Sequence, residues 1–293
     1  MTFIKISIME LIKKQQIQRA LRTYCERYES QNKAANTMKG VSSATVSQIL
    51  NENWDLITDA MWRNVATQIG YKENRWEAVE TNNYRQMMML LADVKENSLV
   101  MAITGEAGSG KTFAASQYTA TNKGTYMLCC NEYWNRKVFL TELLTSLGRD
   151  YTGYTVSEMM NEAVRALKTQ DTPLLILDEA DKLSDQVFYF FITLYNQLED
   201  ECGIVLLATD HLEKRIRKGI KLNKKGYNEI WSRLGRKCVQ LKGVNAADIA
   251  AICEANGIVE SREVDIVVAD SESDLRRVKR KVHALTKKRT LKS

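Results

Sequence analysis

One stretch of eight residues constrains this chain more than any other. Residues 105–112 read Gly-Glu-Ala-Gly-Ser-Gly-Lys-Thr and match the pattern G-x-x-x-x-G-K-[ST]. The stretch follows an apolar run at residues 99–103, which predicts a buried strand, and it precedes a segment compatible with a helix. Glycines let the backbone curl so that its N–H groups point at phosphate oxygens, and the helix N-terminus adds partial positive charge. The stretch therefore predicts a strand, a phosphate-binding loop and a helix, in that order.

The motif assigns roles to its own side chains. Lys111 is expected to reach the β- and γ-phosphates of a nucleotide, and Thr112 is expected to bind Mg²⁺. A glycine-rich turn with an incidental lysine is the alternative explanation of the pattern alone. The predicted nucleotide contacts are Gly105, Glu106, Ala107, Gly108, Ser109, Gly110, Lys111, Thr112 and Phe113.

A second apolar run supports the nucleotide interpretation. Residues 174–179 read Leu-Leu-Ile-Leu-Asp-Glu, which predicts a buried strand that ends in two carboxylates. Asp178 is expected to hold Mg²⁺, usually through water, and Glu179 to orient and deprotonate the attacking water. Asp181 is interpreted as a helix cap, because acids after a strand often cap the next helix. The two motifs together predict ATP hydrolysis, with Lys111 and Glu179 as catalytic residues.

Composition excludes several other classes of site. Only two histidines are present and the six cysteines show no C-x-x-C spacing, so neither a zinc site nor a histidine-based triad is expected. Apolar residues make up 44% of the chain, and no stretch approaches the ~20 apolar residues that a membrane span needs. Nothing at the N-terminus has the pattern of a cleavable signal, so a cytoplasmic location without membrane partners is expected.

The net charge of +6 is unevenly distributed. Residues 214–225 carry seven Lys or Arg and no acid, and residues 274–293 carry nine against one Asp, which leaves −9 on the rest. Two concentrated basic stretches suit a polyanion such as double-stranded DNA, although two solvated faces are the alternative. The predicted DNA contacts in the first stretch are Lys221, Lys224 and Lys225.

Residues 1–70 show a helical period and resemble the small repressor-type DNA-binding domains. An amphipathic helix is predicted to start at a capping box at residues 7–10. A short helix at 31–38, a turn at 39–41 and a second helix at 43–50 have helix-turn-helix punctuation. Ser43, Thr45 and Gln48 would face outward to DNA. A helical packing module without DNA contact is the alternative.

The remaining chain divides into three segments. Residues 71–81 are polar without a period and are interpreted as a linker. In residues 82–242 strands alternate with helices, which predicts an α/β fold with a parallel sheet and the nucleotide at the carboxyl ends of its strands. Residues 243–293 are expected to form a small helical lid with a basic C-terminal tail.

The order of the motifs resembles that of the AAA+ ATPases. It runs from the P-loop and the Asp-Glu strand to Ala208-Thr209-Asp210, Ser232-Arg233 and Asp274-Leu275-Arg276. The resemblance implies a P-loop AAA+ core, ATP and Mg²⁺ as ligands, and a site between subunits of a homo-oligomer. It implies that Arg233 is a finger toward a neighbour's γ-phosphate and that Arg276 is sensor 2. Sensor 1 would be Thr209 or Asp210, although an ionised Asp210 cannot donate a hydrogen bond.

A helix-turn-helix placed before a compact AAA+ module resembles the MuB-type target-DNA activators of transposition, with kinship to TnsC and IstB. That resemblance implies ATP-dependent assembly of a helical filament on double-stranded DNA with little sequence preference, and delivery of that DNA to a DDE transposase. A replication initiator or helicase loader would share the same nucleotide motifs. A nucleotide-switched regulator without turnover is a further alternative.

Overall fold

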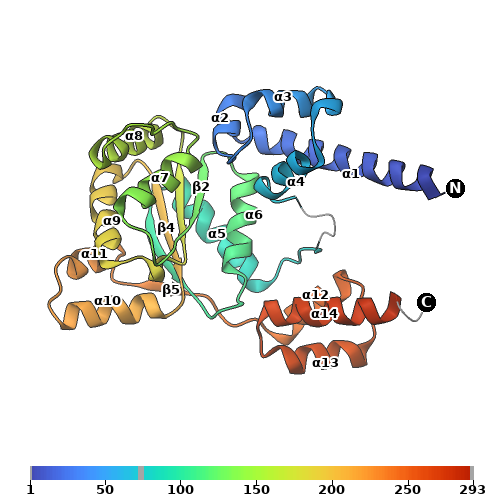
Figure 1. The fold of residues 1–293 in the computed structure, drawn as a ribbon. Coiled ribbons are helices and arrows are strands. Elements are labelled where there is room, and N and C mark those ends of the chain that lie inside the picture. Colours follow the sequence, from blue (N-terminus) through green and yellow to red (C-terminus); the bar gives the residue numbers. More distant parts are fainter. Residues whose placement is uncertain (1, 72–75, 291–293) are drawn as a thin grey trace.

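The computed structural model describes residues 2–71 and 76–290. Along the chain it forms an N-terminal helical domain, a central α/β core and a C-terminal helical lid (Figure 1). Among the described helices, none is both long and apolar enough to cross a membrane.

The N-terminal domain is built from short capped helices around a small core. Ser42 caps the second helix of the predicted pair, because its Oγ accepts from the Thr45 N–H at 3.1 Å. Val46, Ile49 and Leu50 of this helix are buried, as its apolar spacing predicts. The first helix begins at Thr2, so the predicted start at residues 7–10 was wrong. The elements are α1 Thr2–Cys25, α2 Gln31–Asn36, α3 Ser43–Leu50, the 3-10 turn η1 Trp54–Leu56 and α4 Asp59–Gln68.

The core contains a five-stranded parallel sheet in the order β2-β3-β4-β1-β5. Central β4 pairs with β1 in the register Ala102↔Leu206. The strands are β1 Val100–Thr104, β2 Thr125–Cys129, β3 Leu174–Asp178, β4 Gly203–Ala208 and β5 Cys238–Gln240. The helices are α5 Asn82–Glu96, α6 Lys111–Thr121, α7 Arg136–Ser146, α8 Val156–Lys168, η2 Ala180–Lys182, α9 Asp185–Leu198, α10 His211–Lys221 and α11 Tyr227–Arg233.

Helices cover both faces of the sheet (Figure 1). Leu175 and Leu177 of β3 pack on the face covered by α7, α8 and α9, whereas Leu174 and Ile176 pack on the face covered by α5 and α6. Because both of their faces are buried, the inner strands β3 and β4 are nearly continuous apolar runs rather than alternating ones. All five strands end at one edge of the sheet, which is where the phosphate loop and the Asp-Glu pair lie.

The lid has a separate apolar core that includes Ile252, Val267 and Val278. Its helices are α12 Ala246–Ala255, α13 Ser261–Ser271 and α14 Leu275–Thr290. Residues 76–81, which we call the strap, belong to the segment predicted to be a linker. They pack against the lid core through Trp76 and Val79. The strap is hydrogen-bonded to α12, because Glu77 N donates to Asn256 Oδ1 at 3.0 Å and Asn256 Nδ2 donates to Glu77 O at 3.1 Å.

The N-terminal domain touches the core near the end of α7. Lys39 Nζ lies 3.4 Å from Glu142 Oε1. Gly148 follows α7 at φ +65°, and a Cβ there would lie 2.7 Å from the Lys33 carbonyl oxygen. A glycine is therefore needed at this position for both its backbone conformation and the close approach of α2.

Candidate nucleotide site

The loop between β1 and α6 has the backbone that its glycines predict. Gly108 (φ +77°) and Gly110 (φ +92°) both adopt the left-handed conformation that side chains disfavour. Gly108 also permits close contact with the lid, because a Cβ there would lie 2.0 Å from Asp274 Oδ1. The Leu275 N–H donates to the Gly108 carbonyl at 3.0 Å, so α14 begins directly on the phosphate loop.

The amine of Lys111 is held inside this loop by hydrogen bonds to other residues of the loop. The side chain is buried, and its Nζ donates to Gly105 O at 2.7 Å, Glu106 O at 2.9 Å and Ser109 Oγ at 3.2 Å. Burial lowers the pKa of Lys111, because desolvation disfavours the charged amine. A phosphate entering the loop would offer charged oxygens to the same amine.

The side chains of Thr112 and Asp178 bring two oxygen atoms together beside the loop. Thr112 Oγ1 donates to Asp178 Oδ2 at 2.7 Å, and the Glu179 N–H donates to Asp178 Oδ1 at 3.0 Å. Burial raises the pKa of Asp178. Within the described residues, no three His, Cys, Asp or Glu side chains gather as a metal cage. A hydroxyl and one carboxylate suit Mg²⁺ that takes its other ligands from phosphate and water, so the residues present fit this ion.

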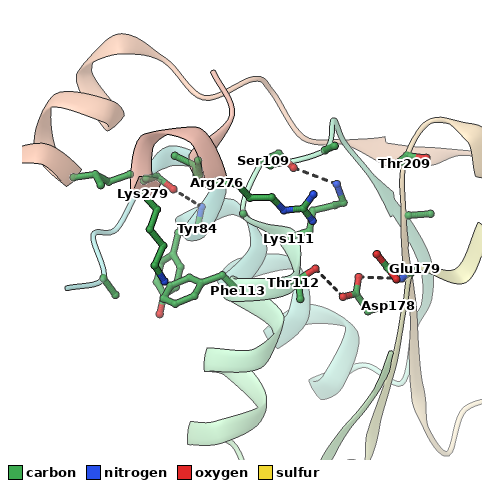
Figure 2. Close-up of a pocket in the computed structure, with 18 of the residues that line it drawn as sticks. Tyr84, Ser109, Lys111, Thr112, Phe113, Asp178, Glu179, Thr209, Arg276 and Lys279 are labelled. Carbon is green, nitrogen blue, oxygen red and sulfur yellow. Dashed lines mark hydrogen bonds between the residues drawn. The ribbon is translucent and has the colours of Figure 1, made fainter. Parts of the chain in front are cut away.

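Glu179 follows β3 in a left-handed conformation, with φ +55°. Its Oε2 accepts from Lys182 Nζ at 2.6 Å and lies 3.9 Å from Cys129 Sγ. The carboxylate thus lies at the same strand edge as Asp178 (Figure 2). In this conformation the predicted general base is ion-paired.

A cavity of about 350 Å³ joins these groups. One end contains Asp178, Glu179 and Thr209, and the other is aromatic, with the rings of Tyr84 and Phe113 6.4 Å apart (Figure 2). Arg276 reaches from α14 toward Lys111. The predicted contacts Ala107 to Phe113 line the cavity, whereas Gly105 and Glu106 contribute carbonyls to Lys111. Sequence reasoning missed a set of lining residues from the strap and the lid: Trp76, Ala78, Val79, Thr81, Ile252, Leu275 and Lys279.

The structure separates the two candidates for sensor 1. Thr209 lines the cavity, whereas Asp210 is exposed, lies outside the lining and is ion-paired with Lys214 at 2.5 Å. Asp210 is therefore placed wrongly for that role, because its carboxylate is directed to α10. Thr209 Oγ1 donates to Asp181 Oδ2 at 2.7 Å. The interpretation of Asp181 as a cap was also wrong, since Asp181 lines the cavity and Ser184 occupies the N-cap position of α9.

Arg233 lies outside the cavity at the end of α11. Its guanidinium donates to Asn196 Oδ1 at 3.1 and 2.8 Å and lies 5.3 Å from the centre of the Tyr195 ring. It does not meet the other predicted site residues within one chain.

The predicted DNA residues differ in their surroundings. Lys224 Nζ lies 3.2 Å from Asp185 Oδ2, so the basic turn after α10 is not free of acids in space. Lys221 and Lys225 are exposed, and neither has an ion-pair partner among the described residues. In the N-terminal domain Ser43 is exposed, whereas Thr45 and Gln48 are half-buried.

Comparisons with known proteins agree with this geometry. Residues 94–216 match the family model described as an AAA domain. The chain is 24% identical over 259 residues to the "ATP-dependent target DNA activator B" of Escherichia phage Mu, covering 86% of this chain and 81% of that protein. The protein of the same name from Escherichia phage D108 matches with the same identity and coverage. The chain therefore has an AAA-type α/β core and resembles target DNA activator B at a distance over most of its length.

Proposed function

We propose that this chain is an ATP-hydrolysing, DNA-binding protein that assembles on target DNA and delivers it to a DDE transposase. The observation that carries the proposal is a cavity that brings the phosphate loop, Asp178 and Glu179 together, in a chain whose likeness to target DNA activator B covers 86% of its length. The likeness extends well beyond the matched AAA domain, which helicase loaders and initiators would share.

The cavity supports a specific division of labour during hydrolysis. Lys111 would leave its carbonyl partners and bind the β- and γ-phosphates, while Thr112 and Asp178 would hold Mg²⁺, which neutralises phosphate charge when bound. Glu179 would leave Lys182, accept the proton of the attacking water and so generate the nucleophile for the γ-phosphorus. Arg276 would stabilise charge on the phosphates from the lid. The adenine ring of ATP would lie between Phe113 and the strap.

The same division requires a second subunit. Arg233 is directed away from the cavity of its own chain, so we propose that it acts as a finger in the site of a neighbour within a homo-oligomeric filament. Arg233→Ala should bind ATP normally and hydrolyse it poorly, because one positive charge is missing in the transition state. Mixing Arg233→Ala with Lys111→Ala should partly restore ATPase activity at hybrid interfaces. An inactive mixture in which hybrid assembly is demonstrated would argue against a finger in trans.

The DNA surface is proposed to lie on the core, with a smaller contribution from the N-terminal domain. Lys221 and Lys225 can offer unpaired charge to phosphates, whereas Lys224 shares its charge with Asp185. Ser43, Thr45 and Gln48 are neutral and would add modest binding that does not depend on nucleotide. Non-specific, phosphate-directed binding suits a protein that accepts many target sequences.

Electron microscopy with plasmid DNA tests the proposal. Filaments on DNA are expected with ATP and should be absent with ADP or without nucleotide. Stimulation of strand transfer by the cognate transposase, under the same conditions, would separate an activator from a helicase loader. ATP turnover without any ATP-dependent DNA association would overturn the proposed function.

A further inference from the structure

A chain of hydrogen bonds leads from the nucleotide cavity to the basic turn at residues 222–226. It begins at Thr209, whose Oγ1 donates to Asp181 Oδ2 at 2.7 Å. Both residues line the cavity, and Figure 2 shows Thr209 at the same end as Glu179. The series of hydrogen bonds continues through Arg215 to Asp185 and Tyr227. We call the five residues of this series the relay: Thr209, Asp181, Arg215, Asp185 and Tyr227.

Thr209 can serve only one acceptor at a time, because a hydroxyl has a single proton to donate. In this structure the proton goes to Asp181. A γ-phosphate in the cavity would offer a stronger, charged acceptor to Thr209 and would repel the Asp181 carboxylate. Phosphate binding and the Thr209–Asp181 hydrogen bond therefore compete.

Arg215 fastens the Asp181 turn to α10. Its Nη1 donates to Asp181 O at 3.1 Å and to Leu183 O at 2.5 Å, and its Nη2 donates to Asp185 Oδ1 at 2.7 Å. The guanidinium also lies 4.9 Å from the centre of the Phe188 ring. A planar guanidinium holds several acceptors in a fixed arrangement, so a shift of the Asp181 turn must displace Arg215 or break these bonds.

The outer end of the relay holds the basic turn. Tyr227 OH donates to Asp185 Oδ1 at 2.7 Å and accepts from Arg215 Nε at 3.1 Å. Lys224 Nζ lies 3.2 Å from Asp185 Oδ2 and 5.9 Å from the centre of the Tyr227 ring. Hydrogen bonds thus connect a cavity-lining hydroxyl, residue by residue, to a lysine of the proposed DNA surface; at Asp181 the connection passes from the carboxylate that Thr209 bonds to the main-chain carbonyl that Arg215 bonds.

We infer that Arg215 is a positioning residue that couples occupancy of the γ-phosphate position to the placement of the 222–226 turn. The inference rests on the proposed function for its consequence, since the turn carries Lys224 and Lys225 of the proposed DNA surface and directly follows Lys221 at the end of α10. Without nucleotide, the Thr209–Asp181 bond holds the relay as observed. With ATP, loss of that bond frees the Asp181 turn and shifts the basic turn through Arg215.

The test compares Arg215→Gln with Arg217→Gln in the full-length chain. Arg217 lies on the same helix, pairs with Glu213 and packs over Trp231, so its replacement removes an arginine of the same kind outside the relay. Thr209→Val removes the switching proton, and Thr209→Ser retains it. Binding of a fluorescent ATP analogue confirms occupancy in each variant. Thermal unfolding identifies variants that are merely destabilised.

Two readouts are measured with and without ATP. Amide hydrogen exchange at residues 222–226 should change on ATP binding in the wild type, Arg217→Gln and Thr209→Ser, and should not change in Arg215→Gln or Thr209→Val. The ratio of DNA dissociation constants without and with ATP should be about 5- to 150-fold in the wild type and close to ~1 in Arg215→Gln.

The outcomes separate the two proposals. If ATP binds and exchange at 222–226 does not change in the wild type, or changes equally in Arg215→Gln, the relay is overturned. If exchange changes as expected and DNA affinity does not depend on ATP, the relay stands and the proposed function fails. A chain that binds no nucleotide overturns both.

Discussion

Three side chains with predicted roles in hydrolysis are held by partners within the chain. Lys111 is bonded to Gly105 O, Glu179 is paired with Lys182, and Thr209 is bonded to Asp181. In each case the partner already bonds the amine, carboxylate or hydroxyl that ATP or the attacking water would need. Binding of ATP as proposed would therefore exchange these internal hydrogen bonds for bonds to phosphate.

Glu179→Gln should trap an ATP-bound state on DNA. The amide cannot accept the proton of the attacking water, while Lys111, Thr112 and Asp178 remain to bind phosphate and Mg²⁺. Loss of a positioned base costs on the order of 10² to 10⁴ in rate, so turnover measured by phosphate release should fall by that factor. Glu96→Gln, on the exposed end of α5, is the matched control and should keep wild-type turnover. Lys111→Ala should instead lose nucleotide, and wild-type activity in both site variants would contradict the site.

Asp185 should contribute stability that disappears in acid. Burial would raise the pKa of this carboxyl, but hydrogen bonds from Tyr227, Arg215 and Lys224 outweigh that effect and lower the pKa to about 2. A lowered pKa stabilises the fold above the unfolded value of about 3.9, and this stability is lost as the pH falls toward about 2. Because the side chain is 41% exposed, the contribution is ~1 kcal/mol rather than the full value of the shift.

Urea unfolding of Asp185→Asn at several pH values measures this contribution. The variant should be less stable than the wild type at pH 6, and the difference should shrink as the pH approaches about 2. Asp200→Asn, at the exposed turn before β4, should follow the wild type at every pH. A difference between Asp185→Asn and wild type that is independent of pH would assign it to packing instead.

The site residues divide according to whether a short sequence motif contains them. Lys111, Thr112, Asp178 and Glu179 were predictable, because each belongs to a short motif that follows a strand. Asp181 was not, because its partner Thr209 lies 28 residues further along the chain. A carboxylate near a helix start has the same local pattern whether it caps the helix or accepts from a distant hydroxyl.

The same limit applies to whole elements. The pattern of a capping box is correct at Thr155, whose side chain and that of Glu158 bond each other's backbone N–H groups. At residues 7–10 the pattern lies inside α1, which begins at Thr2. Gly153 disfavours a helix immediately before Thr155, whereas the residues before Ser7 are compatible with a helix. The alternation of strands and helices in the core was predictable, because long apolar runs do not depend on a distant partner.

The end of α10 and the turn that follows it should carry much of the salt-sensitive DNA affinity. Each lysine that contacts phosphate contributes about 0.9 to the log–log dependence of affinity on salt, so Lys221→Ala with Lys225→Ala should lower the slope by up to ~1.8. Adding Lys224→Ala should lower the slope further by less than the ~0.9 expected for a free lysine, because Asp185 already offsets the charge of Lys224. Salt-titrated anisotropy on two unrelated duplexes measures both slopes.

The control for that pair is Lys168→Ala. This lysine lies outside α10 and the helix-turn-helix and is near Glu201. The control should retain the wild-type slope, and both duplexes should respond alike. An unchanged slope in the Lys221 and Lys225 variant would place the DNA site elsewhere.

At the scale of the whole molecule, the strap is the feature that its polar, aperiodic sequence did not reveal. Residues 71–81 have no period because the described part, 76–81, forms neither helix nor strand and packs by individual side chains on the lid. Trp76 also lies under Lys279, at 5.3 Å from the ring centre. A polar segment without periodicity is interpreted as a linker unless the partner of each side chain is known.

Two truncations test the part that the strap plays. Deleting residues 1–71 should leave ATP-dependent DNA binding largely intact, because the N-terminal domain has its own core and adds only modest binding. Deleting residues 1–81 should weaken ATP binding, since it removes Trp76, Val79 and Thr81 from the cavity wall. Titration with a fluorescent ATP analogue and DNA anisotropy distinguish the two. Loss of ATP-dependent DNA binding on the shorter deletion would move the DNA site to the N-terminal domain.

The position of the strap also determines where this protein can be recombined with others. A junction drawn at the start of α5 would give a chimera whose nucleotide pocket lacks one wall and whose lid core lacks Trp76 and Val79. A junction placed before Trp76 would transfer the ATPase unit intact and leave the preceding helical domain exchangeable. Descendants that acquired a different N-terminal domain by gene fusion would therefore be expected to retain the residues from Trp76 onward.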